Sequence, residues 1–242
     1  MISQKISRYW RVSVVEVTGS TQDDLAAQVA RNEAKNGEVL VAEYQSAGRG
    51  RLDRNFDAPQ SSALLFSLFL QPRRERSEWS FLPLLAGLVT SLALSELEPR
   101  FTVELKWPND LQLSDKKLGG IITQATGEGV IIGIGINVGM AQEELPVVHA
   151  TSLSLEEFSI LDRNSILAGI LNTFEELIER WEDGEDLRHL YRDRSATLAQ
   201  KIQVELPGGE KRTGFAEDIS PAGELILESG ERITVGDIVH LR

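Results

Sequence analysis

The chain has 242 residues, which at about 150 residues per domain allows one or two domains. Its 25 Lys and Arg residues against 37 Asp and Glu residues give a net charge of −12, which disfavours nonspecific binding to nucleic acid or acidic membranes. The chain contains no cysteine, so disulfides, thiolate nucleophiles and cysteine-ligated metal sites are excluded.

The N-terminus carries no visible targeting segment. Lys5, Arg8 and Arg11 interrupt it before an apolar signal-peptide core can form. The longest apolar stretch, residues 81–97, contains Pro83 and is shorter than the roughly 20 apolar residues of a membrane span. We therefore expect a cytoplasmic protein that does not enter a membrane, with this stretch as a buried helix.

The spacing of apolar residues predicts a mixed α+β body. An N-cap signature at Ser20 and Thr21, with an aspartate three positions after each, begins a helix that Asn36-Gly37 ends. The polar run 114–117 between two apolar runs predicts a hairpin turn. Further helices are expected over 81–97 and 166–181, and strands over 37–44, 63–70, 101–105, 111–113, 118–123 and 130–137.

The pattern of apolar and turn-forming residues changes near Lys201. From there, short apolar runs alternate with turns that contain Pro and Gly, which is typical of a small β-barrel. The predicted fold class is α+β, with a mixed or antiparallel sheet flanked by helices and a small barrel after it. We place the domain boundary between residues 197 and 198.

The first candidate site is the segment 48–54, Gly-Arg-Gly-Arg-Leu-Asp-Arg, called the arginine loop below. Its three arginines stand out in a chain of strongly negative charge. Glycine lets the backbone approach a ligand closely, and guanidinium groups offer a planar fork of donors to phosphate or carboxylate oxygens. We interpret the loop as a mobile cover for an anion. A solvated basic loop is the alternative.

The second candidate site is Lys106-Trp107-Pro108-Asn109-Asp110. In the preceding strand, residues 101, 103 and 105 are apolar and share one face, so Lys106 emerges on the other face. A lysine fixed there is a candidate electrostatic catalyst. Asn109 and Asp110 could hold a nucleotide or a metal-bound phosphate. The alternative is a simple turn beside an incidental lysine.

The third candidate site is the strand segment 133–137, Gly-Ile-Gly-Ile-Asn. Gly133, Gly135 and Asn137 share one face of the strand, where a flat group could pack, and Gly119-Gly120 does the same in the neighbouring strand. A dinucleotide-binding fingerprint fits poorly, because Val138 stands where the third glycine is needed. Close packing of the strand against a helix is the alternative.

In this order and spacing, the three segments resemble biotin protein ligases. The resemblance includes Ser20-Thr21-Gln22, Gln45 and Lys117-Leu118-Gly119-Gly120-Ile121, and the tail is similar to the family's small C-terminal SH3-like barrel. The stretch before the Ser-Thr-Gln segment, which includes Met1 to Val17, is too short for the winged-helix domain of the repressor members. We therefore expect a monofunctional ligase that does not bind DNA.

The resemblance implies a class II synthetase-like fold and a two-step reaction. The biotin carboxylate attacks the α-phosphate of ATP to give biotinyl-5′-AMP and pyrophosphate. A lysine of a biotin carboxyl carrier protein then attacks this anhydride and releases AMP. Because the first step brings two anions together, it needs fixed positive charge. Mg²⁺ is expected to accompany ATP, and its protein ligands are left unassigned.

The resemblance also implies roles for individual residues. Lys106 and Arg51 are the predicted catalytic residues, with Lys106 bridging the biotin carboxylate and the α-phosphate. The predicted biotin-binding residues are Ser20, Thr21, Gln22, Gln45, Arg49, Gly50, Arg51, Lys106, Gly119 and Gly120. The predicted ATP-binding residues are Arg51, Arg54, Trp107, Asn109, Asp110, Lys117 and Asn137.

Two residues depart from the pattern of the family, and three other functions are considered. Asp53 and Phe56 stand where the family commonly has Gly and Trp, which puts the flexibility of the arginine loop in doubt. A lipoate or octanoyl ligase shares the fold, but the complete arginine loop favours biotin. A non-catalytic biotin or nucleotide sensor is opposed by the retained Lys106 and Arg51. A DNA-binding repressor is opposed by the acidic charge. We expect a monomer or a weak homodimer.

Overall fold

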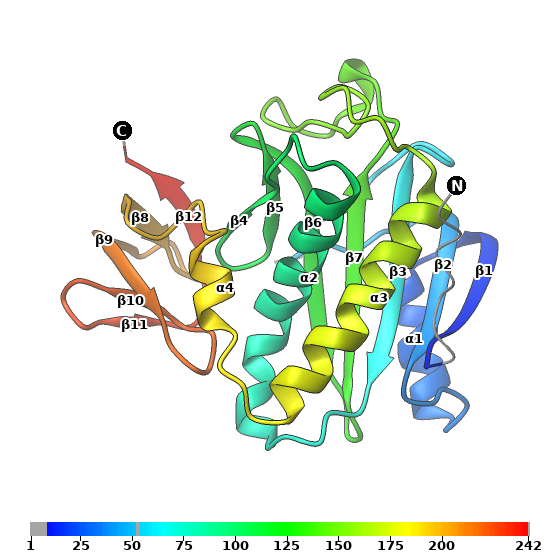
Figure 1. The fold of residues 1–242 in the computed structure, drawn as a ribbon, viewed down its shortest axis with the longest axis horizontal. Coiled ribbons are helices and arrows are strands. Elements are labelled where there is room, and N and C mark those ends of the chain that lie inside the picture. Colours follow the sequence, from blue (N-terminus) through cyan, green and yellow to red (C-terminus); the bar gives the residue numbers. More distant parts are fainter. Residues whose placement is uncertain (1–8, 52–53, 242) are drawn as a thin grey trace.

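The computed structural model describes residues 9–51 and 54–241. Its centre is a seven-stranded mixed sheet with the order β1-β2-β3-β7-β6-β5-β4 (Figure 1). Only β1 and β2 pair in parallel, and every other neighbouring pair of this sheet is antiparallel. The strands are β1 (Arg11–Thr18), β2 (Glu38–Gln45), β3 (Ala63–Leu70), β4 (Glu104–Lys106), β5 (Asp110–Leu113), β6 (Lys116–Ala125) and β7 (Val130–Asn137).

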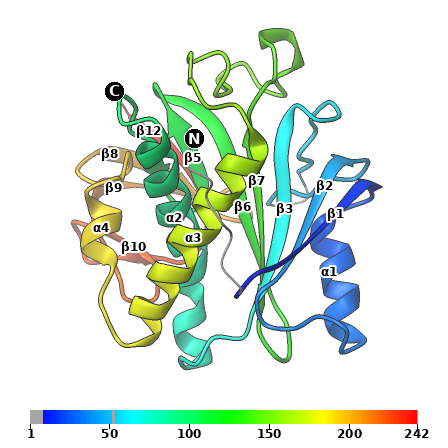
Figure 2. The same ribbon diagram turned by 45° about the vertical axis from the view of Figure 1, so that its right-hand side comes forward.

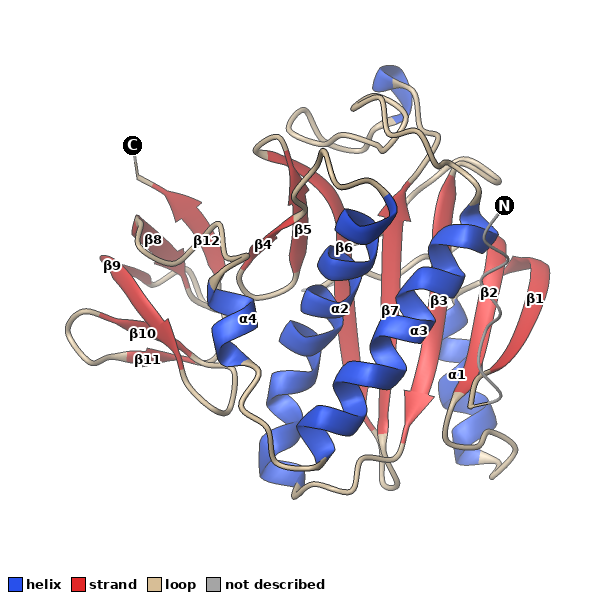
Figure 3. Ribbon diagram, viewed as in Figure 1, coloured by secondary structure: helices blue, strands red, loops and turns tan. Residues whose placement is uncertain are grey.

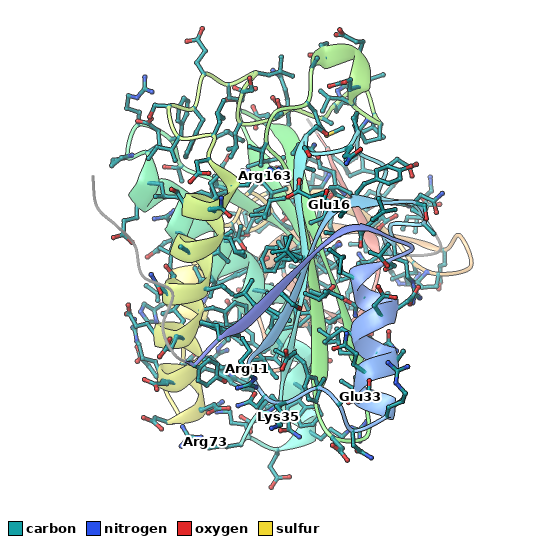
Figure 4. The ribbon with its side chains drawn as sticks, turned by 90° about the vertical axis from the view of Figure 1, so that its right-hand side faces the viewer. Arg11, Glu16, Glu33, Lys35, Arg73 and Arg163 are labelled. Atoms are coloured by element: carbon teal, nitrogen blue, oxygen red, sulfur yellow. The ribbon has the colours of Figure 1, made fainter. Side chains whose placement is uncertain are left out.

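Helices cover the two faces of this sheet unequally. The long helices α2 (Leu82–Leu97) and α3 (Arg163–Glu182) run side by side over one face, and α1 (Thr21–Ala30) lies on the other (Figures 1 and 2). Every residue of β3 and β7 is buried between these layers. Viewed edge-on, β1 crosses the outer edge of the sheet between α3 and α1, with Arg11 and Glu16 near its two ends (Figure 4). The cavity described below lies on the α1 face.

Helix α2 and the short helix before it, η1 (Arg76–Phe81), form the most apolar helical stretch. In the described part of the chain, Arg76–Leu97 is the one helical stretch whose length and composition would allow a membrane crossing, and 67% of its apolar window is buried inside the fold. The sheet and α3 cover it. The predicted buried helix over 81–97 is thereby confirmed.

The C-terminal residues form a second sheet, called the small β domain below (Figure 3). Its five antiparallel strands have the order β11-β10-β9-β8-β12. The backbone of Leu105 in β4 joins the segment before this domain through bonds to Arg194 O (2.8 Å) and from Ala196 N (3.0 Å). The strands are β8 (Lys201–Glu205), β9 (Lys211–Ile219), β10 (Leu225–Leu227), β11 (Arg232–Ile233) and β12 (Asp237–His240), preceded by α4 (Arg188–Arg192).

The structure confirms the α+β class, the flanked mixed sheet and a separate C-terminal β domain. The boundary at 197/198 stays a prediction; β8 begins at Lys201. Strand β1 was not predicted, although four of its eight residues are valine; none of its residues is buried, and it holds its place at the sheet edge by pairing with β2. Helix α1 ends at Ala30 rather than near Asn36, since Asn32 adopts a left-handed φ of 57°.

Candidate functional site

A cavity of ≈ 300 Å³ opens on the α1 face of the sheet. Every one of the predicted site residues lines it, from Ser20 at the start of α1 to Asn137 at the end of β7. The arginine loop contributes Arg51 and the end of β4 contributes Lys106 to the same space. The volume is at the lower end of the range usual for small-molecule sites. The structure thus brings the three candidate segments together, while the role of each residue stays a prediction.

A hydrogen-bonded network forms the polar floor of the cavity. The backbone N–H and the hydroxyl of Thr21 both donate to Gln45 Oε1, at 2.7 and 3.0 Å. The Thr21 hydroxyl also lies 2.8 Å from Ser67 Oγ, which donates to Gln22 Oε1 at 3.3 Å. Three elements, α1, β2 and β3, are therefore held in fixed relation around the floor. Ser67 was not singled out in the sequence, although a lone hydroxyl inside the apolar strand β3 is a signal.

Ser20 does not cap its helix, and the predicted capping interaction is wrong at this point. It occupies the N-cap position with extended backbone, but its side chain makes no capping hydrogen bond. Its hydroxyl is buried and has no hydrogen-bond partner among the described residues. Buried polar atoms are nearly always satisfied, so this hydroxyl beside the cavity is available to a ligand atom or a water.

Asn137 presents a second orphaned atom at the other side of the cavity. Its Nδ2 donates to Thr151 O at 2.9 Å, which fixes the amide. Its Oδ1 is buried and finds no partner within the described residues. An amide oxygen in this position is available to a donor group of a ligand or to a water.

Most cations of the cavity are already paired with carboxylates. Arg49 contacts Asp23 at 2.6 Å, and Lys117 contacts Asp110 at 2.6 Å. Lys106 differs, because its ammonium group forms no hydrogen bond or ion pair with any described residue. An ammonium group that lines a cavity without an internal counter-charge is available to an anionic ligand.

Arg51 is the most firmly held cation. Its Nη1 donates to Asn109 Oδ1 at 3.0 Å and to Gly236 O at 3.4 Å, and lies 3.7 Å from Asp237 Oδ1. Asn109 is in turn oriented by a 2.8 Å bond from its Nδ2 to Ile121 O. Burial lowers the pKa of Arg51, while the carboxylates of Asp237 and Asp110 raise it. The guanidinium stays charged at any physiological pH.

Asp237 was missed by the sequence analysis. It belongs to β12 of the small β domain, and it also forms a close ion pair with Arg54. No local pattern marks it, because it lies 183 residues beyond Arg54 in the chain. Asp53, the departure noted in the arginine loop, lies outside the described residues.

Trp107 has a different setting from the polar residues around it. It lines the cavity but is only 1% exposed, and its indole N–H donates to Gly223 O in the small β domain at 3.0 Å. Its backbone N–H donates to Thr197 Oγ1 at 3.0 Å. The indole therefore ties the seven-stranded sheet to the small β domain.

Gly119 and Gly135 are each required for a different physical reason. A Cβ on Gly119 would lie 2.3 Å from the backbone oxygen of Gly135, so this glycine permits close pairing of β6 with β7. A Cβ on Gly135 would lie 2.8 Å from the ring of Phe56, which packs over it. The flat group expected against the glycine face is thus, in this structure, a side chain of the chain itself.

This contrast yields a prediction with two alanine variants. We expect Gly119→Ala to lower the free energy of unfolding by about 1–3 kcal/mol, because a rigid backbone atom must move. Gly135→Ala should change it by less than about 1 kcal/mol, since the Phe56 ring can rotate away, but should alter the cavity. Urea unfolding monitored by circular dichroism measures both. Equal losses of stability in the two variants would contradict this assignment.

The described residues contain no cluster of three or more His, Cys, Asp or Glu side chains that could hold a metal ion. Asp110 and Asp237 line the cavity, but each is engaged by a basic side chain. Mg²⁺ commonly binds through one or two carboxylates together with substrate phosphates and water. The residues therefore fit a Mg²⁺ ion that arrives with a nucleotide rather than a resident metal centre.

A second cavity of ≈ 520 Å³ adjoins the first. It shares Arg51 and Asn109 with the first cavity and extends between β6 and the turn at Gly223 of the small β domain. Arg49, Gly50 and Arg51 of the arginine loop thus lie at the junction of the two cavities.

Comparison with known proteins gives consistent results. The model of the biotin/lipoate A/B protein ligase family matches residues 14–140. The chain is 38% identical over 96% of its length to a biotin--[acetyl-CoA-carboxylase] ligase of Mycobacterium tuberculosis, of which it covers 90%. It is 34% identical over 90% of its length to the bifunctional ligase/repressor BirA of Escherichia coli, of which it covers 69%. A solved biotin protein ligase of Aquifex aeolicus in complex with biotin and ATP superposes with a TM-score of 0.81 at 28% identity, covering 96% of this chain and 99% of that one.

Proposed function

The chain belongs to the biotin/lipoate A/B protein ligase family, and we propose that it is an ATP-dependent biotin–[acetyl-CoA-carboxylase] ligase. In this proposal it activates biotin as biotinyl-5′-AMP and transfers the biotinyl group to a lysine of a biotin carboxyl carrier protein. One observation carries the proposal: Lys106, which has no ion pair among the described residues, shares one cavity with the arginine loop and the polar floor at Ser20 and Gln45. That cavity presents polar groups that suit a neutral head group and cations that suit a carboxylate and a phosphate.

The polar floor suits the biotin end of the ligands. The ureido group of biotin carries one carbonyl oxygen and two N–H groups, so it needs donors and acceptors close together. Ser20 Oγ is buried with no described partner and can serve as either. The Gln45 amide is held by Thr21 through its oxygen, which directs its nitrogen as a donor. Preorganised groups of this kind bind with a small loss of conformational entropy.

The cationic side of the cavity suits the first chemical step. A carboxylate oxygen of biotin bonds to the α-phosphorus of ATP, the bond to the β-phosphate breaks, and pyrophosphate leaves. Lys106 lies free to contact both anions, and Arg51 supports the phosphate oxygens. Fixed charges act without reorganisation at the moment of reaction, which is the main source of catalysis in phosphoryl and acyl transfer. Mg²⁺ bound with ATP would neutralise the triphosphate.

The second step needs access for a protein lysine. The neutral amine bonds to the acyl carbon of biotinyl-5′-AMP, the bond to the phosphate oxygen breaks, AMP leaves, and the proton of the amine is released to solvent. The adjoining cavity between β6 and the small β domain supports this step, because it meets the first cavity beside Arg51. An acyl-adenylate hydrolyses readily in water, so the arginine loop is proposed to shield it.

Several expectations from the sequence stay predictions within this proposal. They are the residue roles, the location in the cytoplasm, the absence of DNA binding and a monomeric or weakly dimeric state. The net charge of −12 supports the absence of nonspecific binding to DNA.

The function is tested by mass spectrometry of a carrier domain incubated with the protein, biotin, ATP and Mg²⁺. We expect a single biotinyl adduct on the carrier only when every component is present. Parallel reactions with lipoate and octanoate in place of biotin test the sister activity of the family. An adduct formed with lipoate but not with biotin would refute the proposed substrate, and no adduct with any acid would refute the enzyme assignment.

A further inference from the structure

The small β domain places a carboxylate inside the cavity. Asp237 at the start of β12 forms a close ion pair with Arg54, and its other oxygen lies 3.7 Å from Arg51. One aspartate of the C-terminal domain thus faces two arginines of the catalytic domain. These are guanidinium groups that the proposed function assigns to the phosphates of ATP.

The position of Asp237 is fixed by the packing of the turn before it. A Cβ on Gly236 would lie 2.5 Å from Val204 Cγ1 and 3.1 Å from Glu205 O. Glycine therefore lets this turn lie directly against β8. The backbone oxygen of Gly236 also accepts from Arg51 at 3.4 Å. The contact of Asp237 with the two arginines therefore belongs to the packed interface between the two domains.

The ion pairs of Asp237 contribute little to the stability of the fold. Arg51 is 22% exposed and is held independently by Asn109 Oδ1 at 3.0 Å. Arg54 is 65% exposed, and ion pairs of exposed side chains contribute little to stability. The main consequence of Asp237 is therefore its charge. A carboxylate uses the same guanidinium donors as a phosphate, and it repels a phosphate placed beside it.

We propose that Asp237 is an internal competitor for the anionic ligand. Its carboxylate lowers the affinity of the cavity for nucleotide phosphates, and a bound phosphate replaces it on Arg51 and Arg54. Nucleotide binding thereby releases a contact between the small β domain and the arginine loop. The identity of the anion as a nucleotide phosphate rests on the proposed function.

The experiment compares two variants that each remove one negative charge. Asp237→Asn keeps the shape of the side chain and removes the competitor. Glu205→Gln is the matched control, because Glu205 pairs with Asp237 across β8 and β12 but makes no ion pair with a described residue. Binding of ATP with Mg²⁺, and of inorganic pyrophosphate alone, is measured by titration calorimetry on the full chain without biotin.

We expect Asp237→Asn to bind both probes about two- to fivefold more tightly than the parent, and Glu205→Gln to bind as the parent does. Tighter binding separates competition from a structural role, since a damaged interface would weaken binding. In a double variant that also carries Arg54→Gln, the gain in affinity from Asp237→Asn should be smaller, because Asp237 and Arg54 form one ion pair with each other. Asp237→Ser repeats the test should the first variant fold poorly.

Unchanged or weaker binding by Asp237→Asn would overturn the proposal, as would an equal gain in Glu205→Gln, which would indicate bulk charge. Failure of every variant to bind either probe would overturn it as well. The proposed function fails by a different observation, the absence of biotinyl-5′-AMP and of carrier adducts. The two failures are therefore distinguishable.

Discussion

Replacing Lys106 by alanine is expected to lower the rate of biotinyl-5′-AMP formation by about 10²–10³-fold, as is usual when one fixed electrostatic donor is removed from an active site. Its ammonium group has no ion pair or hydrogen bond within the described residues, so the substitution breaks no internal contact. The fold should therefore persist. Pyrophosphate release in single turnovers measures the rate, and thermal unfolding confirms the folded state.

Lys116→Ala is the matched control for this prediction. Lys116 begins β6 outside the cavity and forms an ion pair with Glu156 at 3.1 Å. Its replacement by alanine therefore removes the same single positive charge, but away from the cavity. We expect that variant to keep the rate of the parent. A normal rate in Lys106→Ala, or an equal loss in both variants, would remove Lys106 from the proposed chemistry.

The sequence predicts the buried elements well because their residues carry periodic apolar signals. Strands β3 and β7 and helices α2 and α3 are confirmed near their predicted limits. The short hairpin is also confirmed, with Ser114 and Asp115 at positive φ in the turn between β5 and β6. Edge elements are predicted poorly, since an exposed strand such as β1 gains its stability from pairing with β2 rather than from burial.

The candidate site was predictable to the extent that its residues lie in compact motifs. The arginine loop and the Lys106 turn were found as local patterns, and the cavity joins them. The orphaned hydroxyl of Ser20 was not predictable, because the same residue type at the same position usually caps a helix. Asp237 could not be found from a local sequence pattern either, since its contact with Arg54 depends on how two domains pack.

Trp107→Ala is expected to have the second large effect, a loss in the free energy of unfolding. The indole is 1% exposed, and truncation of a buried aromatic side chain to alanine costs about 3–5 kcal/mol. Trp107→Phe isolates the hydrogen bond to Gly223 O and is expected to lower the free energy of unfolding by about 1 kcal/mol, since a carbonyl loses its donor. Denaturant unfolding curves measure both losses.

Trp79→Phe is the matched control, because Trp79 also donates its indole N–H to a backbone oxygen, that of Arg74 at 3.0 Å, but lies in the partly exposed helix η1. Water can replace the lost donor there, so we expect a smaller loss of stability than in Trp107→Phe. The comparison also decides the role of the indole. If it mainly joins the domains, Trp107→Phe changes stability and leaves the KM for ATP within about twofold; a raised KM with unchanged stability would instead make the indole a nucleotide contact, as the sequence predicts.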